Sequence, residues 1–89
     1  MSIEAITSLS QLTVGQSGQV TELHLGGEMR RRLQDLGVIE GTRIRCLQRS
    51  IFGDPCAYLI RGAVIALRNH DSRQIFVRTL PLSHSGQSR

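Results

Sequence analysis

The clearest pattern along the chain is helical and is centred on Met29, Leu33 and Leu36. These apolar residues recur at positions i, i+4 and i+7, so they share one face of a short helix. Polar residues fill the other side, and Gly37 follows where a left-handed residue commonly ends a helix. We therefore predict a helix of two to three turns near residues 28–36. Its three apolar side chains should be buried, so that the helix plugs one opening of a small β structure.

Strand-like alternation of apolar and polar residues dominates the rest of the chain. It predicts five short strands, at residues 17–25, 42–49, 56–60, 63–68 and 75–77. In the second strand Ile44 and Cys46 take the inward phase. Arg43, Arg45 and Arg49 take the outward phase and should face water.

Short polar or glycine-containing segments connect these strands. Ser8 is placed to cap a single helical turn, and a bulge is predicted near Glu22. Gly53 and Gly62 mark tight turns, and residues 69–73 are expected to form a polar turn or one helical turn. Five short strands, tight corners and one plug helix describe a mainly β, five-stranded, partly open barrel.

The length and composition limit what this chain does. Eighty-nine residues suffice for one domain with one compact core, without a deep catalytic cleft. No apolar run approaches the roughly 18 residues of a membrane-crossing helix, and the N-terminus lacks the pattern of a signal peptide. We expect a cytoplasmic protein with reduced cysteines. The domain should span residues 8–78, between a flexible segment at 1–7 and a disordered tail at 79–89.

All eleven basic residues are arginines, and the formal net charge is +4. The basic character begins at the predicted helix, because residues 28–49 hold six arginines against three acidic residues. The planar guanidinium group suits carboxylates and phosphates, so an acidic protein surface or a nucleic acid is the natural partner. A solvated arginine-rich face without a partner is the alternative interpretation.

No arrangement of residues indicates catalysis. A phosphate-binding G-x-x-x-x-G-K-[ST] loop is excluded because the chain has no lysine, and residues 15–18 lack the spacing of a nucleophile elbow. Cys46 and Cys56 fall on inward positions and are interpreted as buried thiols. The histidines stand too far apart to form a metal site: His24, His70 and His84. We predict neither an enzyme nor a resident metal ion or cofactor.

Several segments, in their order and spacing, resemble the FeoA family, the small cytosolic component of bacterial ferrous-iron uptake. They are Arg31-Arg32-Leu33-Gln34-Asp35-Leu36-Gly37-Val38-Ile39-Glu40-Gly41-Thr42, Phe52-Gly53-Asp54-Pro55, Arg61-Gly62 and Ile65-Ala66-Leu67-Arg68. The resemblance extends from about Leu9 to Val77. It implies an SH3-like barrel and a partner, the FeoB-type membrane GTPase that moves Fe(II). The same module forms the C-terminal domain of iron-dependent repressors.

The resemblance thus implies a non-enzymatic accessory that docks on the cytosolic GTPase region of the transporter. It would take no small-molecule substrate and would meet the membrane only through its partner; self-association is left open. From the outward phases of the helix and the second strand, we infer that the docking face consists of Arg30, Arg31, Gln34, Arg43 and Arg45.

Three alternative functions remain at this point. The first is a small basic barrel that binds RNA mainly through charge, and the second is a detached C-terminal domain of an iron-dependent repressor. The third is a purely structural or oligomerising module in which edge strands of the barrel pair between chains. The chain is poor in the aromatic residues that line proline-rich peptide grooves or stack on single-stranded nucleic acid. It offers only Phe52, Tyr58 and Phe76, and we do not expect nucleic acid to be the ligand.

Overall fold

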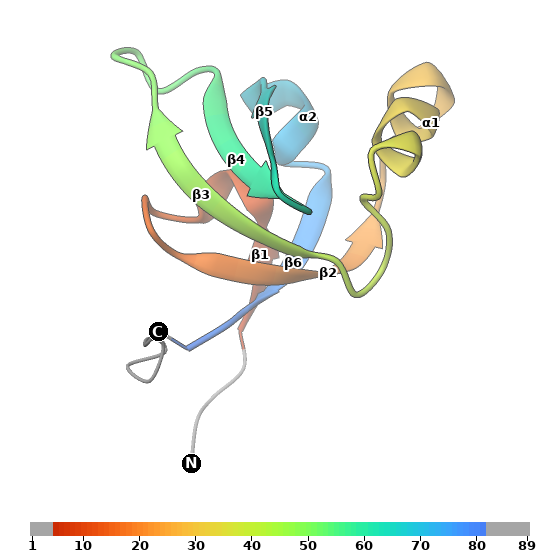
Figure 1. Cartoon of the computed structure of the whole chain (residues 1–89), viewed down its shortest axis with the longest axis horizontal. Helices are drawn as coiled ribbons and strands as arrows, with labels where there is room; N and C mark the ends of the chain where they lie inside the picture. Colours follow the sequence, from red (N-terminus) through yellow and green to blue (C-terminus); the bar gives the residue numbers. More distant parts are fainter. Residues whose placement is uncertain (1–4, 82–89) are drawn as a thin grey trace.

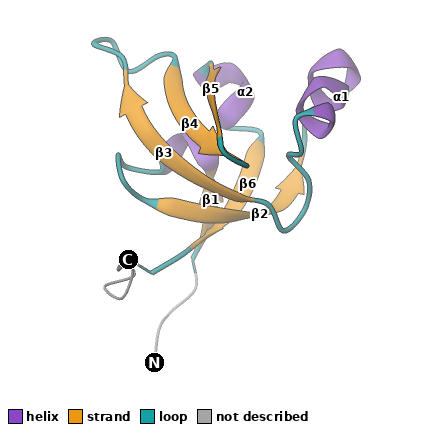
Figure 2. Ribbon diagram, viewed as in Figure 1, coloured by secondary structure: helices purple, strands orange, loops and turns teal. Residues whose placement is uncertain are grey.

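The computed structural model describes residues 5–81, which form a curved antiparallel sheet with three short helical segments (Figure 1 and Figure 2). The elements in chain order are β1 (Ile6–Ser8), the 3-10 helix η1 (Leu9–Gln11), β2 (Ser17–Leu23), α1 (Gly27–Asp35), β3 (Arg43–Arg49), β4 (Cys56–Ile60), β5 (Ala63–Leu67), α2 (Asn69–Ser72) and β6 (Ile75–Thr79). The strand order across the sheet is β1-β6-β2-β3-β4-β5. Strands β1 and β5 are the two edges of the sheet, so the barrel is partly open.

The sheet has six strands and not the five that the sequence predicts. The mainly β, partly open fold is otherwise confirmed. The additional strand is β1, where Ile6 pairs with Arg78 and Ser8 pairs with Phe76 of β6. Three residues are too few to show an alternating pattern, so the sequence places Ile6 and Thr7 in a flexible segment. Their order comes from pairing with a strand about 70 residues further along the chain.

The two ends of the described chain lie next to each other. The backbone N–H of Thr79 donates to the carbonyl oxygen of Ala5 over 2.9 Å, beside the pairing of β1 with β6. The tail predicted to be disordered falls outside the described residues, except for residues 79–81.

The expected cap at Ser8 is wrong, because its side chain bonds to the hydroxyl of Ser10 (2.8 Å) and makes no bond to the helical backbone.

One apolar core lies inside the curved sheet, and Tyr58 is its largest fully buried side chain. The alternation in β3 and β4 is as predicted, with Ile44, Cys46 and Ile60 turned inward beside it. Each fully buried aliphatic side chain stabilises the fold by about 1.5–3 kcal/mol. The other apolar core residues are Leu9, Leu12, Val20, Leu25, Leu33, Val38, Cys56, Leu67, Ile75 and Val77.

Two irregularities interrupt the pairing of the strands. The predicted bulge near Glu22 is confirmed, because the register between β2 and β6 shifts between Val20 and Glu22. A second shift lies in β3, between Cys46 and Gln48, and was not predicted. A bulge adds one residue to a strand and so reverses which side chains point inward beyond it.

The second bulge changes the position of Arg49, which the sequence predicts to face water. Arg49 instead pairs with Cys56, a buried residue of β4. Its guanidinium donates to the carbonyl oxygens of Leu12 (2.5 Å) and Ser10 (3.0 Å) and contacts the Cys56 sulfur (3.4 Å). The prediction for Arg49 is therefore wrong, and this arginine ties η1 to the sheet.

Helix α1 lies beside the sheet and is attached to the core mainly by Leu33, which is fully buried (Figure 1). Met29 is half-buried against the core, as expected of the apolar face. The predicted burial of Leu36 is wrong, since 41 % of this side chain is exposed. The plug helix of the sequence prediction thus inserts one side chain fully, not three.

The end of α1 explains why Leu36 remains at the surface. Gly37 adopts a φ of +94°, and its N–H donates to the carbonyl oxygen of Gln34, while the N–H of Val38 donates to that of Leu33. This Schellman arrangement reverses the chain directly after the helix. It brings Val38 into the core, where the sequence pattern had placed Leu36.

Candidate docking surface

The outer face of the sheet carries a row of paired side chains that crosses four strands. Arg45 of β3 lies opposite Ser17 of β2 and Leu59 of β4, and Leu59 lies opposite Val64 of β5. Residues that pair directly point to the same face of a sheet. The row is therefore basic and polar at its β2–β3 end and apolar at its β5 end, where Val64 is 67 % exposed.

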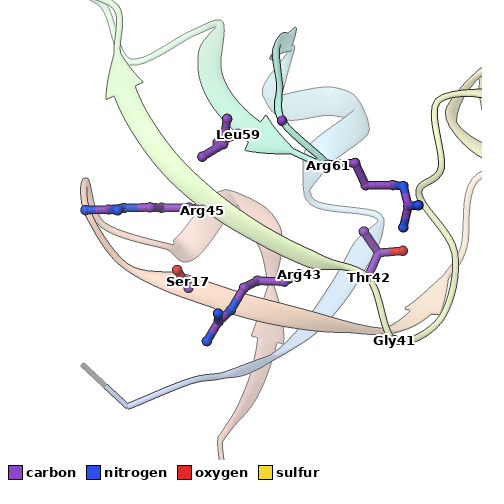
Figure 3. A pocket seen from close by; sticks show the side chains of 8 residues that line it. Ser17, Gly41, Thr42, Arg43, Arg45, Leu59 and Arg61 are labelled. Carbon is purple, nitrogen blue, oxygen red and sulfur yellow. The ribbon is translucent and has the colours of Figure 1, made fainter. Parts of the chain in front are cut away.

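A shallow hollow of about 470 Å³ lies over this face (Figure 3). Arg43 and Arg45 line it from β3, and Arg61 lines it from the turn between β4 and β5. All three side chains are exposed. The remaining lining residues are Ser17, Gly41, Thr42, Leu59 and Gly62.

The three guanidinium groups spread around the hollow and do not converge on one point (Figure 3). Each can make charge-assisted, bidentate hydrogen bonds to a carboxylate or a phosphate. Convergent groups would favour one small anion. Groups that point apart fit several acidic groups distributed over a wider surface, as on a folded protein.

Arg61 is a member of this surface that the docking-face prediction omitted. It adopts a φ of +50°, unusual for a residue other than glycine, and Gly62 follows at +83°. Two residues with positive φ match the two-residue turns that join antiparallel strands, a position usually taken by Asn-Gly. In the sequence, Arg61 directly precedes Gly62 between two strand-like segments, where asparagine would be usual. This arginine at a predicted two-residue turn is the signal that could have marked Arg61 as part of the surface. The Arg61 side-chain stem packs against Gly37, where a Cβ atom would collide with it.

The predicted residues on α1 lie elsewhere. Arg30, Arg31 and Gln34 are exposed, as expected. Arg30 is partly committed to the fold, because it donates to the carbonyl oxygen of Leu23 over 3.1 Å and of Leu25 over 3.5 Å. These bonds fasten α1 to the end of β2.

Four of the five predicted docking residues therefore divide between two separate hollows. Arg43 and Arg45 line the hollow on the sheet, whereas Arg30 and Gln34 line a second hollow of about 350 Å³ near α1. Arg31 lines neither. The second hollow has mixed charge, since its other lining residues include Glu22, His24 and Glu40.

Glu22, an acidic residue of this second hollow, is already engaged within the chain. Nε2 of His24 lies 2.6 Å from Oε1 of Glu22, and the His24 ring lies 4.7 Å from that of Phe76, centroid to centroid. An acidic partner would meet the carboxylates of Glu22 and Glu40 here as well as Arg30. The sheet hollow is thus the more favourable of the two for an acidic partner.

The described residues contain no group of three or more histidine, cysteine, aspartate or glutamate side chains that could hold a metal ion. Cys46 and Cys56 are free and buried, and burial raises the pKa of the Cys46 thiol. A buried thiol with a raised pKa is a poor nucleophile. Within residues 5–81, no helix is long and apolar enough to cross a membrane.

Comparison with known proteins gives a family match and several similar structures. A family model described as FeoA domain matches residues 7–79. No match was found among curated proteins. The solved FeoA protein from Chlorobium tepidum is 31 % identical, with a TM-score of 0.81, over 84 % of this chain and 71 % of that chain.

Two further solved structures help to classify the fold. FeoA from Stenotrophomonas maltophilia, solved with zinc, is 25 % identical with a TM-score of 0.71, over 80 % of this chain and 88 % of that chain. It is described as a prokaryotic SH3 domain protein and as a candidate activating factor of bacterial ferrous iron transport. A manganese-dependent transcriptional repressor is 22 % identical with a TM-score of 0.76, over 90 % of this chain and 45 % of that chain. At this identity the repressor shows a shared fold alone. The predicted SH3-like fold is confirmed.

Proposed function

The chain belongs to the FeoA family, and from this premise we propose that it is an accessory protein of a bacterial ferrous-iron uptake system. In this proposal it acts in the cytoplasm, catalyses no reaction and docks on the cytosolic GTPase region of an FeoB-type membrane transporter. The family match over residues 7–79 supports it. So does the description of the Stenotrophomonas maltophilia relative as a candidate activating factor of ferrous iron transport.

The observation that carries the docking proposal is the exposed basic hollow on the outer face of the sheet. We infer that Arg43, Arg45 and Arg61, the basic face, meet an acidic patch on the GTPase region. Because the three guanidinium groups point apart, they can engage separate carboxylates (Figure 3). Arg31 and Gln34 on α1 form a second, outlying contact region in this proposal.

Binding alone does not regulate a transporter. An accessory protein shifts a conformational equilibrium only by as much as its affinities for the two conformations differ. The proposed mechanism is therefore preferential docking on one conformation of the GTPase region. The basic face supplies long-range attraction, which mainly sets the association rate and its dependence on salt.

A binding titration with the isolated GTPase region tests this proposal. Arg45→Glu should weaken binding about 10-fold at roughly 50 mM salt and less at 150 mM, because screening shortens the reach of surface charges. Arg43→Glu should behave alike, and Arg31→Glu should have a smaller effect. Arg73→Glu is the matched control, since it makes the same charge change at an exposed position outside the basic hollow.

Two outcomes would contradict this function. One is an Arg45→Glu variant that docks like the wild type at low salt. The other is sub-micromolar binding of mixed RNA without detectable binding of the GTPase region. RNA binding would show a linear fall of log affinity with log salt, with a slope of about −0.7 for each neutralised phosphate of a single strand.

A further inference from the structure

The tip of the hairpin between β3 and β4 presents two adjacent, nearly fully exposed apolar side chains. Ile51 is 95 % exposed and Phe52 is 92 % exposed. Single exposed apolar residues are common on protein surfaces and need no explanation. Ile51 and Phe52 are adjacent in the chain on a projecting tip, and exposed apolar surface gathered in one place typically marks an interaction site.

The base of this hairpin is held in place, although its tip is exposed. The backbone N–H of Asn69 donates to Oδ1 of Asp54 (3.0 Å), and its side-chain amide donates to the carbonyl oxygen of Gly53 (3.3 Å). Within the loop, the N–H of Gly53 donates to the carbonyl oxygen of Ser50 (2.8 Å). The two bonds made by Asn69 connect the loop to α2. The tip is therefore presented on a fixed base, which lowers the entropy cost of binding.

The tip is continuous with the basic face along the same hairpin. In Figure 1 the loop extends from the ends of β3 and β4, on the side of the molecule away from α1. From Arg45 to the end of β3 at Arg49 is four residues, about 13 Å at 3.3 Å per residue. A standard protein interface covers about 800 Å² on each partner, roughly 30 Å across. One partner can therefore cover the basic face and the tip together.

We propose that Ile51 and Phe52 are the apolar anchor of the docking surface and insert into an apolar pocket on the partner's GTPase region. This inference rests on the proposed function, and it adds the contact that holds the complex after charge attraction has formed it. Aromatic side chains in desolvated pockets dominate the energy of many interfaces, whereas charges at the rim contribute mainly to association.

A protein pocket fits this tip better than a lipid surface does. Loop residues 50–55 contain Asp54 and no arginine. Stable attachment to a membrane generally needs a second signal besides a small apolar group, such as an adjoining basic cluster. Of the arginines on the strands of this hairpin, Arg49 is engaged with the carbonyl oxygens of Ser10 and Leu12. Arg43 and Arg45 lie on the sheet face, about 13 Å or more along β3 from the tip, so this hairpin places no basic cluster around Ile51 and Phe52.

The experiment is a kinetic binding measurement with the soluble GTPase region as the probe. Phe52→Ala should weaken binding about 30-fold or more, mainly through faster dissociation, and the loss should persist at high salt. Phe52→Leu should retain most of the affinity because it keeps an apolar anchor. Ile6→Ala is the matched control: Ile6 is 59 % exposed and lies in the edge strand β1, three positions from β3 in the sheet and outside both hollows. It should bind like the wild type.

The outcomes separate the anchor from the proposed function. If the wild type does not bind the GTPase region at all, the proposed function fails and the anchor fails with it. If the wild type binds and Phe52→Ala binds equally well, only the anchor is overturned. The anchor is also overturned if vesicles of mixed zwitterionic and anionic lipid bind the wild type but not Phe52→Ala. Self-association that depends on Phe52 would likewise assign the tip to a second copy of this chain. Because Phe52 is exposed, its variants should unfold at the same denaturant concentration as the wild type.

Discussion

The arginines of β3 differ in whether they face water or bond within the fold, and the difference comes from one bulge. Arg43 and Arg45 precede the bulge and remain on the outer face, as the alternation predicts. Arg49 follows it and bonds to backbone carbonyl oxygens inside the fold. Alternation gives the correct face only while the register is kept. The sequence does not show that the register shifts here, so Arg49 could not be placed correctly.

Leu33 and Leu36 share the apolar face that the helical pattern predicts, but only Leu33 is buried in the structure. Leu33→Ala should lower the free energy of unfolding by about 2–5 kcal/mol, because it empties a fully buried site. Leu36→Ala should cost less than about 1 kcal/mol, since Leu36 is 41 % exposed beyond the helix. Urea denaturation of both variants checks this pair. Equal losses would show that Leu36 is packed in the core, contrary to this structure.

At the scale of elements, long periodic segments were predictable and short paired ones were not. The helix at 27–35 and the strands from β2 to β6 follow from the 3.6- and two-residue periods. Strand β1 has three residues, and only its partner β6 defines it. For the candidate docking surface, the exposure of Arg43 and Arg45 was predictable from local alternation. The inclusion of Arg61 was not, because it depends on the turn between β4 and β5 bringing Arg61 to the same hollow as Arg43 and Arg45.

The end of α1 gives a prediction with an internal control. Gly37 adopts a φ of +94° and Gly15 a φ of +91°, so alanine at either position should cost about 1–2 kcal/mol through backbone strain. Only at Gly37 would the new Cβ also meet the side chain of Arg61. The outer atoms of this long side chain can swing aside, so the two variants should lose similar stability in urea denaturation. Gly37→Ala alone should weaken docking on the GTPase region, because it displaces Arg61. Unchanged docking by Gly37→Ala would separate Arg61 from the interface.

Among the ionisable side chains enclosed in the core of the molecule are Tyr58 and Cys46. Burial raises the pKa of Tyr58 from its usual value of 10 to about 12, although the nearby Ser72 hydroxyl partly opposes this. Burial raises the pKa of the Cys46 thiol as well, from its usual 9.0. In both cases the folded state holds its proton at a pH where the unfolded chain has released it. Their contribution to stability is thus complete at neutral pH and decreases as alkali is added.

The expected result is a free energy of unfolding that begins to fall near pH 9 and falls further between pH 10 and 12. Raising the pKa of Tyr58 from 10 to about 12 contributes about 3 kcal/mol to this fall. Urea unfolding under reducing conditions at stepwise pH measures it. Tyr58→Phe should remove the fall above pH 10, and Cys46→Ala should reduce the fall that begins near pH 9. If Tyr58→Phe declines as steeply as the wild type, alkali destabilises the fold by another route.

The pairing of β1 with β6 has a consequence for how such a module is joined to other polypeptides. Because Ala5 and Thr79 are linked by a hydrogen bond, the chain begins and ends its fold at almost the same point. A module with adjoining ends can be appended to a host protein, or spliced into one of its surface loops, without forcing the flanking host residues apart. The closure entropy of such an insertion grows only slowly with its length. The manganese-dependent repressor of similar fold, of which this chain covers 45 %, is a larger protein built with the same kind of unit.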